Sequence, residues 1–337
     1  MSEPMIRVEN LTKDYGTFRA VDKVTFNVRK GEVLGFLGPN GAGKSTTMKM
    51  LTCYLAPTGG VATVAGHDVF ADSLEVRRRL GYLPEDTPLY RDMTVYEFLE
   101  FAAEMRQMDP SKRGGRIKEI GGRCGLSNVA GKLVGELSKG YRQRVGLAQA
   151  ILHDPDILIL DEPPSGLDPN QIVEIRQLIK ELGQEKTVIL STHILPEVQA
   201  TCSRILIISG GKLVADDTPE ALRAREKGSR YRVLVESNGV AAEAIRDKLN
   251  TISGVARCEK AASEAGALGF TLDAAGDTDL RRSIYRAAVD NRWPLLELVR
   301  ESVSLEDVFR HLTTTDATVK SPSTTEDTQR QGEEARS

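Results

Sequence analysis

The stretch that decides the fold of this chain is an octapeptide, Gly38-Pro39-Asn40-Gly41-Ala42-Gly43-Lys44-Ser45. It matches the pattern G-x-x-x-x-G-K-[ST], in which glycines let backbone N–H groups turn toward phosphate oxygens. An apolar run, Val33–Leu37, leads into the octapeptide, and a helix over Thr46–Leu55 is expected to follow. The motif requires this strand–loop–helix context, and the helix N-terminus adds positive potential. The octapeptide and Thr46 therefore form the predicted nucleotide-binding segment, in which Lys44 reaches the β- and γ-phosphates and the Ser45 hydroxyl joins a Mg²⁺ shell.

A second signal is an apolar strand that ends in two adjacent carboxylates. Ile157–Leu160 is followed by Asp161 and Glu162. Side chains alternate along a strand, so the two acids should serve different purposes. Such strand ends are common on their own, but this one shares a chain with a phosphate loop. We therefore predict that Asp161 holds Mg²⁺, directly or through water, and that Glu162 positions and polarises the attacking water.

A third signal is a serine at the start of a helix. The segment Leu137-Ser138-Lys139-Gly140-Tyr141 places Ser138 where an N-cap residue would stand. A serine there, beside the flexible Gly140, can bind a terminal phosphate at the positive end of the helix. Taken alone, the segment is equally typical of an ordinary capped helix.

The composition excludes several classes of function. The chain has 45 basic and 48 acidic residues among 337, a balance without the basic excess of a nucleic-acid footprint. The four cysteines stand far apart and form no C-x-x-C pair, so neither a zinc site nor a redox motif is expected. No apolar run reaches the roughly 18 residues of a membrane span, and the first ten residues lack an apolar signal core. We expect a cytoplasmic protein that spans no membrane itself.

The order of apolar runs and helical patterns divides the chain. Residues 1–225 alternate short strands with helices, which favours a mainly parallel α/β sheet. A helical insertion is expected at about 88–150. Residues 226–312 follow the order β-α-β-β-α-β, which predicts a small ferredoxin-like α+β domain. Ser304 and Asp307 form a possible capping box before a last helix. From 313 to 337 polar and small residues predominate, so this tail is expected to be disordered.

The three signals, in this order, resemble the nucleotide-binding subunits of ABC transporters, above all the ATPases of ABC-2 type exporters of the gliding-motility and drug-resistance groups. The resemblance covers about residues 5–225 and implies a P-loop core with a RecA-like sheet, an antiparallel β subdomain and a helical subdomain. It places Tyr15 where the family stacks an aromatic ring on adenine. It also makes Asp168 part of the D-loop and His193 the switch histidine that contacts the γ-phosphate.

Two departures from the family pattern concern residues near the nucleotide. The usual Leu-Ser-Gly-Gly-Gln signature carries Lys139 and Tyr141 here, while the phosphate-facing Ser138 and Gly140 remain. The Q-loop glutamine is replaced by Glu85, whose carboxylate can still meet Mg²⁺ or water but cannot donate a hydrogen bond when ionised.

The resemblance implies hydrolysis of ATP to ADP and phosphate with Mg²⁺ as cofactor. Lys44, Glu162 and His193 would be the catalytic residues, and Ser45, Asp161 and Glu85 the metal-binding ones. Ser138, Lys139 and Gly140 would face a nucleotide bound by a second copy, so the active form would be a nucleotide-sandwich homodimer. The dimer would drive transmembrane permease subunits and lie at the inner face of the cell membrane through them. Specificity for the transported substrate would belong to the permease.

Alternative interpretations remain open at this point. ABC ATPases of translation or DNA repair usually carry two cassettes or long coiled coils, whereas this chain shows one cassette. A P-loop kinase or GTPase is disfavoured by the Ser138–Gly140 segment and the loop Ser165–Asp168. Residues 230–312 carry no constellation of site residues, and they could form a regulatory or dimerisation module or a packing appendage.

Overall fold

The computed structural model describes residues 3–314, apart from 166, 226–228, 237–238, 264–265, 277 and 302–303. The tail predicted at 313–337 lies outside these residues from 315 onward. Its first two residues, Thr313 and Thr314, are not a tail, because they complete the last helix.

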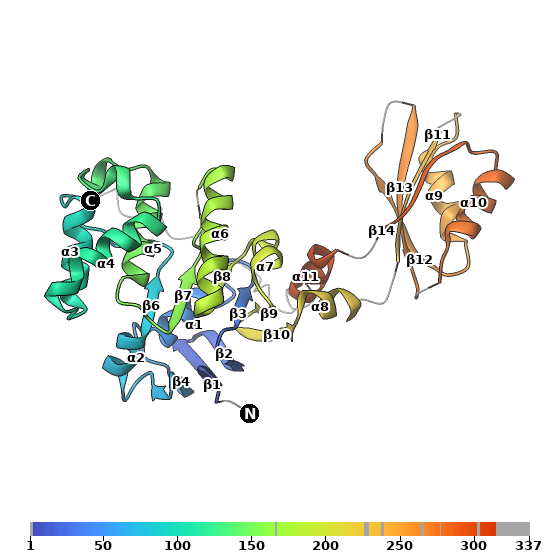
Figure 1. The fold of residues 1–337 in the computed structure, drawn as a ribbon. Helices are drawn as coiled ribbons and strands as arrows, with labels where there is room; N and C mark the ends of the chain where they lie inside the picture. Colours follow the sequence, from blue (N-terminus) through green and yellow to red (C-terminus); the bar gives the residue numbers. More distant parts are fainter. Residues whose placement is uncertain are drawn as a thin grey trace, which may run out of the picture.

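A six-stranded sheet carries the phosphate loop at the end of one of its central strands (Figure 1). The strand order is β10-β9-β3-β8-β7-β6, and every pairing is parallel except that of β10 with β9. The predicted mainly parallel sheet is thereby confirmed. Its strands are β3 (Val33–Leu37), β6 (Leu80–Leu83), β7 (Ile157–Asp161), β8 (Thr187–Thr192), β9 (Arg204–Ser209) and β10 (Lys212–Asp217).

Strands β7 and β8 are buried along their whole length because both faces of the sheet are covered. Ile157 and Ile159 of β7 pack into one core cluster, and Leu158 and Leu160 pack into another on the opposite face. The first cluster joins the sheet to α1 and to a second sheet. The second cluster joins it to helices from the middle of the chain.

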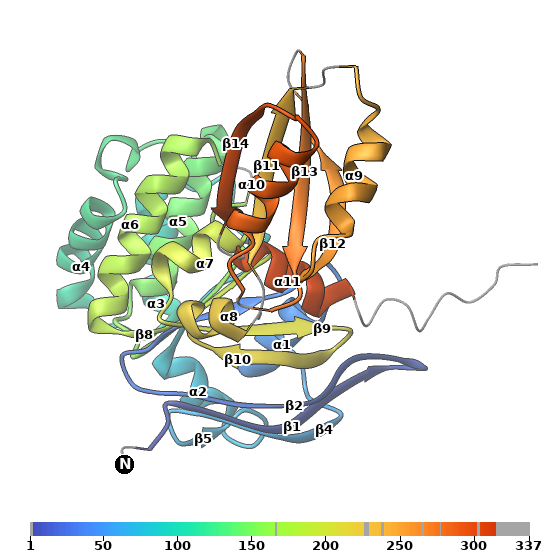
Figure 2. The same cartoon turned by 90° about the vertical axis from the view of Figure 1, so that its right-hand side faces the viewer.

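The second sheet is antiparallel and has the order β2-β1-β4-β5. Figure 2 shows the two sheets as separate layers with α1 (Lys44–Leu51) between them. The helix ends four residues earlier than predicted. Thr52 caps it by donating its N–H to Met48 O, and Cys53 then adopts a left-handed φ of 60°. The strands are β1 (Ile6–Tyr15), β2 (Phe18–Val28), β4 (Gly59–Val64) and β5 (His67–Asp68).

Helices supply the remaining layers of this part of the chain. The stretch 88–150 contains α3 (Val95–Met105), α4 (Pro110–Arg123), α5 (Lys139–Ile151) and two short 3₁₀ helices, η1 (Ser127–Val129) and η2 (Val134–Glu136). None of the helices that the structure describes is long and apolar enough to cross a membrane. The other helices up to residue 225 are α2 (Ser73–Arg79), α6 (Pro169–Glu185), α7 (Leu195–Thr201) and α8 (Pro219–Arg225).

A third sheet, also antiparallel, has the order β12-β13-β11-β14 and its own core around Tyr231, Phe270 and Trp293. With two helices it forms the predicted β-α-β-β-α-β unit of ferredoxin-like topology. Figure 1 shows it set to one side of the central sheet. Its elements are β11 (Arg230–Glu236), α9 (Ala242–Asn250), β12 (Val255–Ala261), β13 (Ala267–Ala274), α10 (Arg281–Asp290) and β14 (Leu295–Glu301).

The last helix, α11 (Leu305–Thr314), does not belong to this C-terminal unit, and this corrects the boundary expected at 312. The helix lies against α8, β9 and β10, as Figure 1 also shows. Leu305 and Val308 are buried in the same core cluster as the central sheet. The predicted capping box is present, because Asp307 N donates to Ser304 Oγ at 3.2 Å and Ser304 N donates to Asp307 Oδ2 at 3.3 Å. The chain therefore leaves the first unit after α8 and returns to it with α11.

This return predicts that Leu305→Ala destabilises the first unit. Leu305 is fully buried, so its truncation should lower the free energy of unfolding by about 2–5 kcal/mol in a urea titration. Leu296→Ala is the control, because this leucine of β14 is 55% exposed and its loss should change stability by less than about 0.5 kcal/mol. Equal effects of the two substitutions would show that α11 adds nothing to the core.

Candidate active site

The phosphate loop joins β3 to α1 and touches backbone at two of its glycines. A Cβ on Gly38 would stand 2.5 Å from Ile208 O. Gly43 has a φ of 106°, and a Cβ there would stand 2.6 Å from Ala20 O. Side chains at these positions would collide with β9 and β2, so the tight curve of the loop requires glycine.

Lys44 is buried inside this curve, with 6% of its surface exposed. Its Nζ donates to Gly38 O at 2.8 Å and to Pro39 O at 3.3 Å, and it lies 3.6 Å from Glu162 Oε1. The loop therefore holds a positive charge at its centre, within ion-pair distance of a carboxylate from another strand.

Glu162 follows β7 in a conformation that non-glycine residues seldom adopt, with a φ of 49°. Its N–H donates to Ser191 O at 2.8 Å, which ties it to β8. Its Oε1 lies 2.9 Å from His193 Nδ1, and its Oε2 accepts a hydrogen bond from Thr192 Oγ1 at 3.1 Å. The structure thus brings three residues of the predicted catalytic set, Lys44, Glu162 and His193, into one cluster.

Asp161, the other acid of the pair, suits a metal ion. It is 1% exposed, and among the described residues no group hydrogen-bonds to its Oδ1. Burial raises its pKa, while the hydroxyls of Ser191 and Ser45 act in the opposite direction. The described residues contain no group of three or more His, Cys, Asp or Glu that could hold a metal by itself. Mg²⁺ is commonly held by one or two carboxylates together with substrate phosphates, so Asp161 and Ser45 fit this ion.

The Ser138–Gly140 segment begins α5 as predicted. Ser138 Oγ accepts a hydrogen bond from Tyr141 N at 3.4 Å, and Ser138 and Lys139 are exposed. Gly140 is buried against the side chain of Gln171 in α6. Within the described part of the chain, no hydrogen bond or ion pair joins Ser138 or Lys139 to the phosphate loop.

Asp168, the predicted D-loop residue, is the N-cap of α6. Its Oδ1 accepts a hydrogen bond from Gln171 N at 2.9 Å, and its own N–H donates to Gln171 Oε1 at 3.4 Å. Because Gln171 also covers Gly140, one side chain connects the D-loop to the start of α5.

Two predicted residues stay outside the cluster. Tyr15 is 48% exposed at the end of β1, where Lys13 Nζ lies 5.5 Å from the centroid of its ring. Glu85 is exposed just beyond β6. Neither has a hydrogen bond or ion pair to Lys44, Glu162 or Asp161 among the described residues, so the assigned roles in adenine stacking and metal binding stay predictions.

Two residues that lie next to Glu162 in the structure were not predicted as site residues from the sequence. Thr192 ends β8, and Glu197 lies on the buried face of α7, with 0% and 4% of their surfaces exposed. A glutamate between the apolar residues Leu195 and Val198 was the signal that could have revealed the second of them.

In sequence and in fold, this chain is similar to the ATP-binding subunits of ABC transporters. A family profile described as "ABC transporter" matches residues 21–165, and one described as an AAA domain, putative AbiEii toxin of a type IV system, matches 134–198. The bacitracin transport ATP-binding protein BcrA of Bacillus licheniformis is 39% identical over 225 residues, which cover 66% of this chain and 72% of that protein. The daunorubicin resistance ATP-binding protein DrrA3 of Streptomyces coeruleorubidus is 30% identical over an alignment of 342 positions, which covers 95% of this chain and 99% of that protein.

Other relatives match over part of their length. The probable multidrug ABC transporter ATP-binding protein YbhF of Escherichia coli (strain K12) is 40% identical over 224 residues, and the match spans only 39% of that protein. Among solved structures, an ATP-binding subunit of an ABC transporter has a TM-score of 0.61 at 30% identity and covers 66% of this chain and 92% of its own. A dimeric bacterial ABC transporter cassette has a TM-score of 0.59 at 28% identity, and the match covers 64% of this chain and 98% of that one.

The close approach of Gly38 to β9 predicts that Gly38→Ala disrupts the loop. The added methyl group would meet a backbone carbonyl that cannot rotate away, so nucleotide affinity should fall about tenfold or more in a titration with a fluorescent nucleotide. Gly121→Ala in α4 is the matched control. Its methyl group meets nothing within 4 Å, and alanine should stabilise the helix by about 0.5–1 kcal/mol. Unchanged affinity in Gly38→Ala would contradict the role of this glycine.

Proposed function

The chain belongs to the ATP-binding subunits of ABC transporters, and from this premise we propose that it hydrolyses ATP to drive a conformational change in separate transmembrane subunits. The observation that carries the proposal is the cluster at the ends of β3, β7 and β8. There a lysine from the phosphate loop lies 3.6 Å from a buried glutamate, which in turn lies 2.9 Å from a half-exposed histidine.

The reaction converts ATP and water into ADP and phosphate, and the protein contributes positioning and charge neutralisation. Lys44 exchanges its hydrogen bonds to Gly38 O and Pro39 O for the β- and γ-phosphates. Asp161 and Ser45 hold Mg²⁺, which neutralises phosphate charge when it is bound. Glu162 accepts a hydrogen bond from the attacking water and orients it in line with the bond that breaks. His193 steadies Glu162 through Nδ1 and contacts the γ-phosphate.

The geometry of α5 supports a site that is shared between two copies. Ser138 and Lys139 are exposed at the positive end of a helix, and the described contacts do not tie them to the phosphate loop of their own chain. A second copy facing the first would bring Ser138, Lys139 and Gly140 onto the γ-phosphate. A related cassette has been solved as a dimer, and another structure of it is described as a post-hydrolysis state bound to ADP and phosphate.

The membrane partners are permease subunits that the cassette dimer drives from the inner face of the cell membrane. The names of BcrA and DrrA3 refer to bacitracin transport and daunorubicin resistance. These names favour export of a small molecule. The exposed Glu85 and the nearby helices α3 and α4 are the surface on which such a subunit would dock.

The role of Glu162 predicts that Glu162→Gln retains ATP binding but loses most turnover. The amide fills the same space and its oxygen can still accept a hydrogen bond, but it lacks the negative charge with which a carboxylate polarises the water. Turnover measured by phosphate release should fall by about 10²-fold or more, while affinity for ATP stays close to that of the wild type.

Lys44→Ala provides the contrast, because it removes the charge that neutralises the phosphates and should abolish both binding and turnover. Near-normal phosphate release by Glu162→Gln would refute the assignment of Glu162, and wild-type affinity in Lys44→Ala would refute that of the phosphate loop.

The shared site predicts complementation between two inactive chains. Ser138→Asp keeps an N-cap side chain for α5 but directs a negative charge at the phosphate of the partner. It should be inactive alone, as Lys44→Ala should be. A mixed dimer combines the intact loop of one chain with the intact Ser138 of the other, so mixing the two proteins should restore phosphate release. Ser138→Thr is the control that should stay active. A mixture as inactive as its components would contradict the composite site.

A further inference from the structure

The hydroxyl of Thr192 lies between two buried carboxyl groups. Its Oγ1 is 3.1 Å from Glu162 Oε2 and 3.0 Å from Glu197 Oε2. A third contact comes from the backbone, because Ile194 N donates to the same oxygen at 3.1 Å. The Thr192 hydroxyl and the two carboxyl groups are almost fully buried, so they must form their hydrogen bonds with one another rather than with water.

The number of protons at this oxygen restricts the arrangement. A hydroxyl donates one hydrogen bond and accepts two. Ile194 N takes one acceptor position, so one remains. If both carboxyls were ionised, they would compete for the single hydroxyl proton, and one of them would face an oxygen with no hydrogen between them. The three contacts are all satisfied only if one carboxyl carries a proton and donates it to Thr192.

The surroundings decide which carboxyl carries the proton. Glu162 already has partners suited to a carboxylate, because Lys44 Nζ lies 3.6 Å and His193 Nδ1 lies 2.9 Å from its Oε1. Glu197 has no ion pair within 4.0 Å in the part of the chain that the structure describes. Burial raises the pKa of Glu197, and the charge of Glu162 adds to this.

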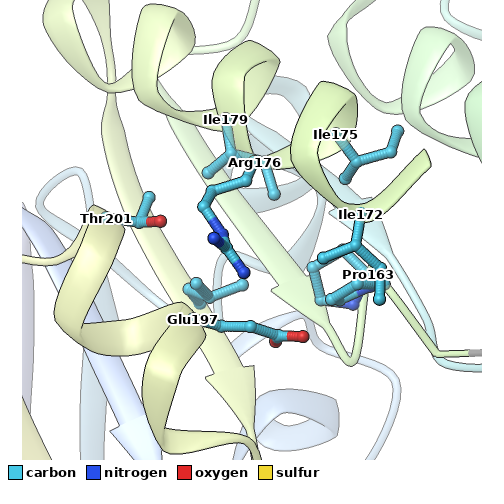
Figure 3. A pocket seen from close by; sticks show the side chains of 9 residues that line it. Pro163, Ile172, Ile175, Arg176, Ile179, Glu197 and Thr201 are labelled. Carbon is cyan, nitrogen blue, oxygen red and sulfur yellow. The ribbon is translucent and has the colours of Figure 1, made fainter. Parts of the chain in front are cut away.

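Other charged groups face Glu197 from the neighbouring elements. The hydrogen bond with Thr192, the charge of Arg176 in α6 and that of His193 lower its pKa, but burial has the largest effect and the pKa is raised on balance. Figure 3 shows Arg176 and Glu197 on the lining of a small pocket between α6 and α7, with Thr201 nearby. The thiol of Cys202 also lies within electrostatic reach, and burial raises its pKa, so it is neutral.

We propose that Glu197 is a positioning residue for hydrolysis: as a neutral acid it donates to Thr192 Oγ1, which turns the Thr192 hydroxyl toward Glu162 and fixes the carboxylate that orients water. The inference rests on the proposed hydrolysis of ATP. Val198, the next residue of α7, packs against Gly35 of β3, where a side chain would leave no room. The central sheet therefore holds Glu197 at a fixed distance from the site.

The test compares conservative and disruptive variants of both residues. Glu197→Gln can still donate, through its amide, and should retain most of the wild-type kcat. Glu197→Leu removes the hydrogen-bond donor, and Thr192→Val removes the hydroxyl that connects Glu197 to Glu162. Each should lower kcat about tenfold or more with little change in the affinity for ATP. Thr192→Ser keeps the hydroxyl and should stay active. The double variant Thr192→Val/Glu197→Leu should lose no more than either single one, because the residues act in series.

The pH profile gives a readout that a merely structural role would not change. As pH rises through the raised pKa of Glu197, the ionised carboxylate can only accept and competes with Glu162 for the Thr192 proton. Wild-type kcat should fall, while Glu197→Gln cannot ionise, so the ratio of its kcat to that of the wild type should rise with pH. All groups other than Glu197 are the same in both proteins, so their pH dependence cancels from the ratio. Glu32→Gln, which disrupts an ion pair with Arg204 elsewhere, should show a constant ratio.

The outcomes separate this inference from the proposed function. If the wild type released no phosphate, the proposed function would fail first. If the wild type is active and Glu197→Gln loses as much kcat as Glu197→Leu, or if its ratio to the wild type does not change with pH, the neutral donor is refuted. Thermal melting of each variant identifies any loss that comes from unfolding.

Discussion

The in-register parallel pairing of β3, β7 and β8 is the constraint on which the rest of this structure depends. Leu37 pairs with Thr192 and Asp161 with Ser191, so three strands end at the same edge of the sheet. The phosphate loop, the two acids and the histidine leave the sheet at this edge. Ligands of open α/β sheets bind at the carboxyl ends of the strands for this reason. A shift by one residue would turn the side chains at this edge to the opposite faces.

The layers on both faces of the sheet keep this edge rigid. The antiparallel sheet and α1 cover one face, and the helices of the second core cluster cover the other. Backbone passes so close to Gly38 that the curve of the loop is set by β9 rather than by the loop itself. A rigid frame lets Glu162 keep a left-handed backbone conformation, which costs about 1–3 kcal/mol and persists only where the surroundings enforce it.

The C-terminal unit is attached to this frame at two places. The chain leaves after α8 and returns with α11, whose Leu305 lies in the core of the nucleotide-binding unit. Arg230, at the start of β11, forms ion pairs at 2.8 Å with both Asp273 of β13 and Asp307 of α11. A movement of the C-terminal sheet would therefore act on α11 and, through it, on the edge of the central sheet at β9 and β10.

Most features that rest on neighbouring residues could be predicted from the sequence, although α1 ends four residues before its predicted end. The octapeptide, the apolar strands and the capping residues Ser138 and Ser304 could be predicted because loops, strands and caps depend on spacings of a few residues. The motifs also predicted that Lys44, Glu162 and His193 share one site, and the three residues do lie together in the structure. Only the tertiary structure decided where α11 packs and that Thr192 joins Glu162 to Glu197. These contacts join segments far apart in the chain or depend on which face of a helix is buried, and no local pattern records either.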